Sequence, residues 1–377
     1  MKIPYNKPFI AGNELTHIQD AVENGQLAGN GKYTKLCQDH IKKVTHSGKV
    51  LLTTSCTSAL EMSAKLINLK INDEVLMSPF TFVSTANAFL MSNAKPVFVD
   101  IRENTLNIDE LKIEEKISSK TKAICPVHYA GISCEMTKIL QIAKENKLLV
   151  IEDAAQGFCS TYNNMPLGSM GDMSTFSFHE TKNFIAGEGG ALLINNPKYF
   201  KRSEIIWEKG TNRASFFRGE IDKYTWVDIG SSYLPSELIA AFLYGQFEKA
   251  DIIKQKRLQI WNYYFERLSK LEENGMVKLP VVPNNCEHNG HIFYILTKTE
   301  DERDNLLNFL KQKSIGAIFH FIPLHESPMG WKLGYKRGMF PIAENISRRI
   351  IRLPLFFKIT KSEQDFIIRT IFSYYEK

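Results

Sequence analysis

Leu148-Leu149-Val150-Ile151-Glu152-Asp153 is a continuous apolar run that ends in two carboxylates. Apolar runs of this length that contain β-branched residues are typical of strands buried on both faces of a parallel sheet. Before this run, residues 135–146 predict a helix. The same alternation recurs, with strands predicted over 49–53, 96–100, 123–128 and 191–194 and a helix over 58–66. The sequence therefore predicts an α/β fold with a mainly parallel central sheet.

The pattern changes beyond residue 237. A single long helical stretch is predicted from 236 to 261, and a strand over 291–296 comes before two later helix candidates. These features predict a smaller α+β domain that follows the sheet. We expect a large domain over residues 1–250, which includes an N-terminal arm, and a small C-terminal domain over residues 251–377.

Composition excludes several classes of protein. Of the 377 residues, 44% are hydrophobic, which is too many for a disordered chain. No apolar run approaches the roughly 18 residues that a membrane-spanning helix needs, and the first residues lack the apolar core of a signal peptide. The net charge of +6 is mild and gives no reason to expect a nucleic-acid partner. The six cysteines lack C-x-x-C spacing, which predicts reduced thiols in a cytoplasmic protein.

Polar groups end or follow two of the predicted strands and one further short apolar run. Asp153 ends one strand, the hydroxyl-rich run 54–58 opens a helix after another, and Lys182 follows a short apolar run that ends at Ser177-Phe178. Parallel α/β sheets bind ligands at the carboxyl ends of their strands. Each group also has an ordinary explanation, as a helix cap, a turn acid or a surface lysine. The glycines of 187–190 lack the spacing of a phosphate-binding loop and predict a turn that returns the lysine to the sheet.

Taken together, the three groups suit one cofactor, pyridoxal 5'-phosphate. Its phosphate suits a helix start, its ring nitrogen a carboxylate and its aldehyde an amine. A lysine with the ordinary pKa near 10.4 is neutral in only roughly four molecules per ten thousand at pH 7. We therefore expect burial to lower the pKa of Lys182.

Five motifs, in this order along the chain, resemble those of the DegT/DnrJ/EryC1/StrS family of sugar-nucleotide aminotransferases. They are 53–60 (TTSCTSAL), 80–88 (FTFVSTANA), 151–156 (IEDAAQ), 177–190 (SFHETKNFIAGEGG) and 320–325 (HFIPLH). The resemblance covers essentially the whole chain. It implies the fold of the aspartate aminotransferases, fold type I of the pyridoxal phosphate enzymes, with a large cofactor domain and a smaller C-terminal domain.

The resemblance also implies roles for individual residues. Seven of them are expected to bind the cofactor, namely Cys56, Thr57, Phe82, Asp153, Gln156, Ser177 and Lys182. Among these, Lys182 is the catalytic residue that forms the imine and moves the proton, and Asp153 pairs with the ring nitrogen. Phe82 stacks on the ring, Gln156 lies near the ring hydroxyl, and the other three hold the phosphate, where the Cys56 thiol is a spectator. Substrate binding is expected at His325 and, through positive charge, at Arg213; a loop histidine with no such role is the alternative for His325. We expect no metal site.

One branch of this family is similar to the present chain over residues 209–228 and 230–238. That branch acts in the synthesis of enterobacterial common antigen, which, like the O-antigen of lipopolysaccharide, is a surface polysaccharide. This similarity implies transfer of the amino group of L-glutamate to dTDP-4-keto-6-deoxy-D-glucose, giving dTDP-4-amino-4,6-dideoxy-D-galactose and 2-oxoglutarate. The alternatives are the gluco epimer, a 3-keto or UDP-linked sugar, and a regulatory or assembly protein that only binds the cofactor.

The family pattern further implies a homodimer with shared sites. Many relatives have Asn or Arg at the position of Leu234, where the side chain reaches the phosphate in the neighbouring subunit. Here Ser231 or Ser232 makes that contact, or the contact is absent.

Overall fold

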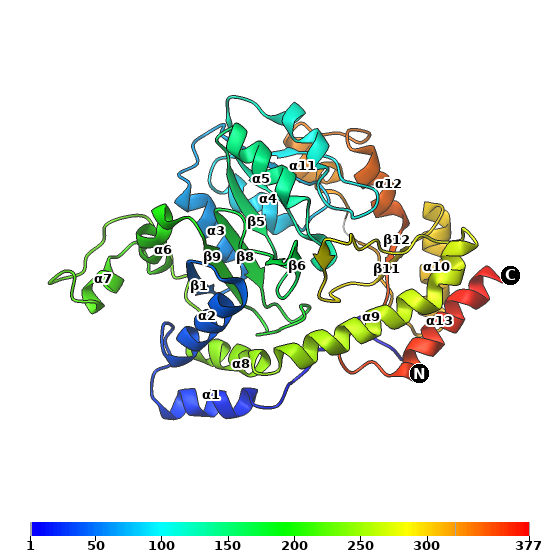
Figure 1. The fold of residues 1–377 in the computed structure, drawn as a ribbon, viewed down its shortest axis with the longest axis horizontal. Helices are drawn as coiled ribbons and strands as arrows, with labels where there is room; N and C mark the ends of the chain where they lie inside the picture. Colours follow the sequence, from blue (N-terminus) through cyan, green and yellow to red (C-terminus); the bar gives the residue numbers. More distant parts are fainter. Residues whose placement is uncertain (1, 321, 377) are drawn as a thin grey trace.

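The computed structural model describes residues 2–320 and 322–376, and it is built around a seven-stranded sheet (Figure 1). The strand order is β1-β9-β8-β5-β4-β2-β3. The strands are β1 (Lys49–Thr53), β2 (Glu74–Met77), β3 (Lys95–Phe98), β4 (Thr121–Cys125), β5 (Leu149–Asp153), β8 (Met173–Ser177) and β9 (Gly190–Ile194). The predicted α/β class and mainly parallel sheet are confirmed. Strand β2 was not predicted from the sequence.

One strand departs from the parallel arrangement. Strand β9 runs antiparallel to both of its neighbours, β1 and β8, whereas β8, β5, β4, β2 and β3 pair in parallel. Because β1 is reversed relative to β9, and β9 relative to β8, strands β1 and β8 point the same way. The carboxyl ends of β1, β5 and β8 therefore lie at one edge of the sheet.

Side chains of successive strand residues point to opposite faces, and each face has its own core. Leu51 belongs to the core under α3 and α4, and Val50 and Leu52 belong to the core under α2 and α8. A further core lies between the sheet and α5. These helices are α2 (Lys32–Thr45), α3 (Cys56–Leu66), α4 (Val83–Leu90), α5 (Met136–Glu145) and α8 (Glu237–Phe247). Burial of this apolar surface is the main force that holds the layers together.

The long helical stretch predicted over 236–261 is two helices rather than one. Helix α8 ends at Phe247, and α9 (Ala250–Glu273) begins after a turn at Lys249, where ψ is 18°. This value lies outside the helical range, so the chain changes direction without a proline or a glycine. Figure 1 shows the long α9 extending from α8 toward α10 and α13.

The C-terminal part has its own apolar core. It contains residues of α9, α10 (Glu300–Gln312), α13 (Lys361–Tyr375), β11 (Tyr294–Leu296) and β12 (Ile350–Arg352), and Ile3 from the N-terminal segment. The remaining helices are α1 (Glu14–Glu23), α6 (Phe200–Trp207), α7 (Arg213–Phe217), α11 (Pro328–Lys332) and α12 (Pro341–Arg349), and short strands are β6 (Thr161–Tyr162), β7 (Met165–Pro166) and β10 (Cys286–Glu287).

The boundary at residue 250 stays a prediction. Residues 324–346 pack in the core of the large sheet, together with Tyr294. The chain thus returns to the first domain after it has entered the second. Within the described ranges, no helix has both the length and the apolar character needed to cross a bilayer.

Candidate active site

The carboxyl edge of the sheet brings together segments that are distant in the sequence. Gly190, the first residue of β9, is paired with Thr53 on one side and with Ser177 on the other. Asp153 is paired with Thr175 on the next strand. A β-carbon on Gly190 would lie 2.3 Å from the backbone nitrogen of Cys56, so only glycine lets the start of α3 approach β9 this closely.

Helix α3 begins at this edge and presents its amino-terminal N–H groups there. Ser55 is the cap, and its Oγ accepts a hydrogen bond of 3.0 Å from the N–H of Ser58. The first bond within the helix is made by Ala59, so the N–H groups of Cys56 and Thr57 precede it. Such groups, with the positive end of the helix dipole, bind anions. The Thr57 hydroxyl is held by a 2.8 Å hydrogen bond to Ser84 of α4.

Asp153 is a buried carboxylate with two donors. Its Oδ2 accepts a 2.6 Å hydrogen bond from the Thr85 hydroxyl, and its Oδ1 accepts one of 3.1 Å from the N–H of Ala155. Thr85 in turn lies 3.0 Å from the hydroxyl of Thr81. Sequence reasoning did not single out Thr85, because 68 residues separate it from Asp153. The two hydrogen bonds fix the carboxylate in one orientation.

Lys182 lies in the loop between β8 and β9, half-buried, and its N–H bonds to the carbonyl of His179 at 2.9 Å. Burial lowers the pKa of its amine, and the Arg352 guanidinium lowers it further, while the negative charge of Asp153 acts in the opposite direction. This shift increases the neutral fraction of the amine, and its direction is the one that the sequence led us to expect. Burial also raises the pKa of the Cys56 thiol to about 12, which keeps this thiol protonated and inert near neutral pH.

The depressed pKa of Lys182 predicts a pH-dependent cost in stability. Between the folded pKa and the ordinary value near 10.5, the unfolded chain binds more protons at this lysine than the folded chain does. Stability from this group therefore rises with pH across that window. We expect Lys182→Met to be more stable than the unliganded wild type near neutral pH, and the advantage to shrink toward pH 10. Urea unfolding of both proteins at several pH values measures this difference; an advantage that grows with pH contradicts it.

Three further residues predicted to bind the cofactor lie beside this edge. The Gln156 Oε1 accepts a 2.7 Å hydrogen bond from the N–H of Ala130, which orients the side chain. The Ser177 hydroxyl, at the last residue of β8, accepts a 3.4 Å hydrogen bond from His179. Phe82 directly precedes α4, and 52% of its surface is exposed. Stacking of Phe82 on the cofactor ring stays a prediction.

A histidine that sequence reasoning did not single out lies next to Lys182. The Nδ1 of His291 is 2.8 Å from the side-chain oxygen of Asn183, the residue after the lysine. In the sequence, His291 is simply the first residue of the strand predicted over 291–296. Its partner is 108 residues away, so nothing in local spacing could reveal the contact.

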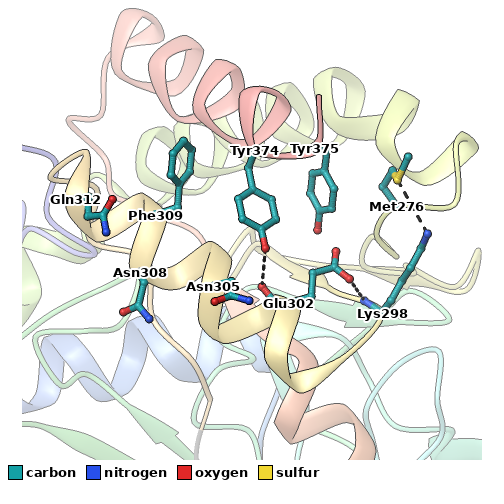
Figure 2. A pocket seen from close by; sticks show the side chains of 9 residues that line it. All are labelled: Met276, Lys298, Glu302, Asn305, Asn308, Phe309, Gln312, Tyr374 and Tyr375. Atoms are coloured by element: carbon teal, nitrogen blue, oxygen red, sulfur yellow. Dashed lines mark hydrogen bonds between the residues drawn. The ribbon is translucent and has the colours of Figure 1, made fainter. Parts of the chain in front are cut away.

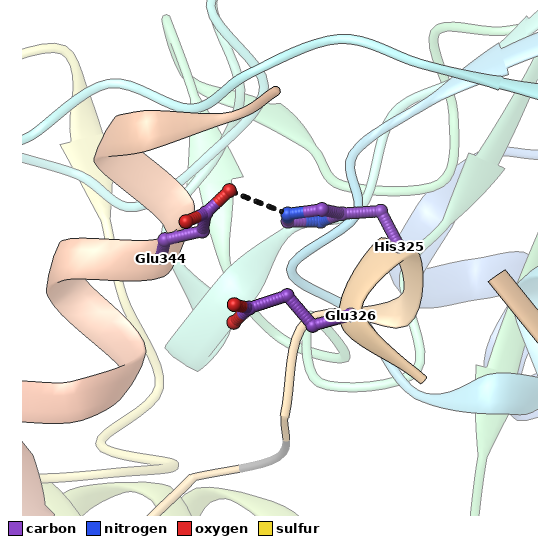
Figure 3. Close-up of side chains that lie close together, drawn as sticks. All are labelled: His325, Glu326 and Glu344. Carbon is purple, nitrogen blue, oxygen red and sulfur yellow. Dashed lines mark hydrogen bonds and ion pairs between the residues drawn. The ribbon is translucent and has the colours of Figure 1, made fainter. Parts of the chain in front are cut away.

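His325 is fully buried and belongs to a cluster of charged groups (Figure 3). Its Nε2 lies 2.9 Å from Glu344, and Arg348 bridges Glu344 and Glu326 at 3.5 and 2.7 Å. The histidine and the two carboxylates could together hold a metal ion by spacing alone, but the Arg348 guanidinium already forms ion pairs with both acids. We assign the cluster to packing of α12 against residues 324–326. Substrate binding by His325 stays a prediction.

Arg213 begins α7, and its guanidinium lies over the ring of Phe217 at 4.9 Å. Figure 1 shows α7 and the loops beside it projecting away from the sheet. Among residues 2–320 and 322–376 of this single chain, no contact joins Arg213 to Lys182. Its role toward the substrate stays a prediction.

A separate cavity of about 750 Å³ lies between α10 and α13 (Figure 2). Tyr374 and Tyr375 reach into it from α13, facing Glu302 and Asn305 of α10. None of the predicted site residues lines this cavity. The candidate site is therefore defined by the sheet edge.

In the 320–325 motif, Phe321 lies outside the described residues.

Comparisons with known proteins agree with this geometry. The model of the DegT/DnrJ/EryC1/StrS aminotransferase family matches residues 8–372. The spore coat polysaccharide biosynthesis protein SpsC of Bacillus subtilis is 33% identical, over 98% of this chain and 96% of its own. The GDP-perosamine synthase of Escherichia coli O157:H7 is 30% identical, over 99% and 98%. The pyridoxal phosphate form of a putative sugar aminotransferase from Streptococcus pneumoniae superposes with a TM-score of 0.92 at 25% identity, covering 100% of this chain and 99% of that one.

Proposed function

The chain belongs to the DegT/DnrJ/EryC1/StrS aminotransferase family, and from this membership we propose that it transfers the amino group of L-glutamate to dTDP-4-keto-6-deoxy-D-glucose. The products are dTDP-4-amino-4,6-dideoxy-D-galactose and 2-oxoglutarate. The convergence of Asp153, Lys182 and the start of α3 at one sheet edge is the observation that carries the amino-transfer chemistry. The choice of sugar nucleotide rests on the similarity of residues 209–238 to the branch that makes this product.

As a member of this family, the chain is a pyridoxal phosphate-dependent sugar aminotransferase. The residues present fit that cofactor in three respects. The N–H groups of Cys56 and Thr57 at the helix start suit an anionic phosphate. The buried carboxylate of Asp153 suits a protonated ring nitrogen, and the lysine amine with its lowered pKa suits an aldehyde.

The cofactor, when bound, supplies an electron-withdrawing ring and a carbonyl that exchanges amines. The chain supplies the rest. Asp153, oriented by Thr85, holds a proton at the ring nitrogen and so keeps the ring electron-withdrawing. The Nζ of Lys182 removes the proton from the carbon that bears the donor's amino group, and it later returns a proton to the sugar carbon that receives the nitrogen. Phe82 and Gln156 orient the ring.

An NMR measurement tests the substrate. The protein is incubated with ¹⁵N-labelled L-glutamate and dTDP-4-keto-6-deoxy-D-glucose. The proposal requires ¹⁵N at C4, with small couplings at H4 that report the axial nitrogen of the galacto product. Large couplings would assign the gluco epimer, and no labelled sugar from this substrate would refute the proposed substrate.

We also propose that the active unit is a homodimer in which residues 211–232 pack against a second copy. This arm is rich in exposed apolar side chains: Phe217 is 68% exposed and Trp226 78%. Apolar patches of this kind mark protein–protein contacts. Leu234 is half-buried, while Ser231 and Ser232 are exposed and are the candidates to reach across the interface.

Each of the six cysteines is a free thiol, which supports a cytoplasmic, reducing environment.

The proposed contact through residues 211–232 can be tested by substitution. Trp226→Asp places a charge in the middle of the proposed contact, so the variant is expected to sediment as a monomer and to lose most of its activity. Trp331→Asp is the matched control, because Trp331 of α11 is also largely exposed, at 59%. Analytical ultracentrifugation compares the two variants with the wild type. A monomeric wild type, or an equal loss of dimer in both variants, contradicts the proposed interface.

A further inference from the structure

The imidazole of His291 has a defined tautomer, fixed by a buried asparagine. Asn183 donates through its Nδ2 to the carbonyl of Asn289 at 2.9 Å, which orients the amide so that its oxygen faces His291. An amide oxygen only accepts hydrogen bonds. The Nδ1 of His291 must therefore carry the proton of the 2.8 Å bond, and Nε2 keeps a lone pair.

Positive groups surround this ring. Burial lowers the pKa of His291 well below its ordinary value, and the charges of Lys182, Arg257 and Arg352 lower it further. Arg257 also donates a 2.9 Å hydrogen bond to the carbonyl of His291, so both the backbone and the ring of this residue are held. A neutral imidazole adds no charge beside the lysine.

The same hydrogen bonds continue to the loop after β5. The Nδ2 of Asn289 donates to the carbonyls of Gln156 and Phe158 at 2.8 and 2.9 Å. Asn183 and Asn289 are both buried. One network thus joins the residue after Lys182, the residue proposed to face the ring hydroxyl, and the segment that leads into β11. A buried hydrogen-bond network of this kind favours one arrangement of the groups that it connects.

We propose that His291 is a positioning residue for Lys182, which it controls through its hydrogen bond to Asn183. This inference rests on the proposed function, because positioning matters only if Lys182 attaches the cofactor. The role of the ring is to donate a hydrogen bond to Asn183 from the position of Nδ1. A side chain with a donor at that position can therefore replace the imidazole. A side chain with its donor at the position of Nε2 cannot.

Two amide substitutions separate these cases. In His291→Asn the amide nitrogen falls near the place of Nδ1, and in His291→Gln it falls near that of Nε2. Both variants are polar and of similar size to each other. Fluorescence titration of the unliganded proteins with pyridoxal phosphate is expected to give a dissociation constant within about threefold of the wild type for His291→Asn, and one about tenfold weaker for His291→Gln, the effect of one buried hydrogen bond. The pH titration of the visible band of the bound cofactor is expected to shift in His291→Gln only.

His288→Leu is the control. His288 lies three residues away with its ring 4.4 Å from that of Trp261, and the hydrogen bond to Asn183 is made by His291. This control is expected to bind the cofactor as the wild type does. Equal affinity in His291→Asn and His291→Gln, or an equal loss in all three variants, overturns the inference. If the wild-type protein itself attaches no cofactor, the proposed function fails as well, and thermal unfolding of each unliganded protein identifies a variant that has merely lost its fold.

Discussion

Lys182→Ala is expected to lower the turnover number by at least about 10⁴-fold, the upper range for a positioned proton-transfer group. The variant loses both the amine that attaches the cofactor and the base that moves the substrate proton. Non-covalent binding of pyridoxamine phosphate should persist, because Cys56, Thr57 and Asp153 are unchanged. Single-turnover assays with the amino donor, together with titration of pyridoxamine phosphate, measure the two effects separately.

The matched control is Lys198→Ala. Lys198 lies in the short 3₁₀ helix Pro197–Tyr199, exposed at the surface with its amine over the ring of Tyr199. We expect it to keep wild-type turnover. A Lys182→Ala variant that is folded and retains a tenth of the wild-type activity contradicts the assignment of this lysine.

Asp153→Asn is the second change with a large expected effect. The amide preserves the size of the side chain and can still accept from Thr85, but it carries no negative charge to hold a proton at the ring nitrogen. Loss of a preorganised electrostatic interaction in a water-poor site typically costs about 10²- to 10³-fold in the turnover number. We expect a decrease of that size, with a smaller effect on the affinity for L-glutamate, because the charge matters most where the ring accepts electrons.

Steady-state kinetics with L-glutamate measure the effect on the turnover number separately from the effect on the affinity for the donor. Asp251→Asn, at the exposed start of α9, removes a carboxylate that is not among the predicted site residues and serves as the control. If Asp153→Asn behaves like this control, Asp153 does not face the ring nitrogen and the orientation proposed for the cofactor is wrong.

Much of the sheet was predictable from sequence because its strands are short apolar runs with abrupt polar ends. Strand β5 is an example: its apolar residues give the strand, and the two acids that follow give the edge. Strand β2 was not predicted, since it has only four residues and begins with Glu74. The antiparallel direction of β9 could not be predicted either, because an apolar run buried on both faces carries no information about its direction.

Part of the candidate site was likewise predictable from the sequence, and part was not. Asp153 and Ser177 are the last residues of β5 and β8, and Lys182 lies in the loop after β8, so the topology alone gathers them at one edge. Thr85 and His291 were missed because each acts through a hydrogen bond to a residue far along the chain, and only packing brings the partners together. The resemblance to the family located Phe82, whose exposure could not be deduced from an apolar residue in an apolar segment.

The central claim is that Lys182 attaches pyridoxal phosphate at the sheet edge where Asp153 and α3 converge. Borohydride reduction of the wild-type protein in the presence of the cofactor, followed by peptide mapping by mass spectrometry, tests this claim most directly. We expect one modified lysine, Lys182, and loss of the visible absorption band on reduction. Label spread over exposed lysines such as Lys198, or a single label at another lysine, would contradict it.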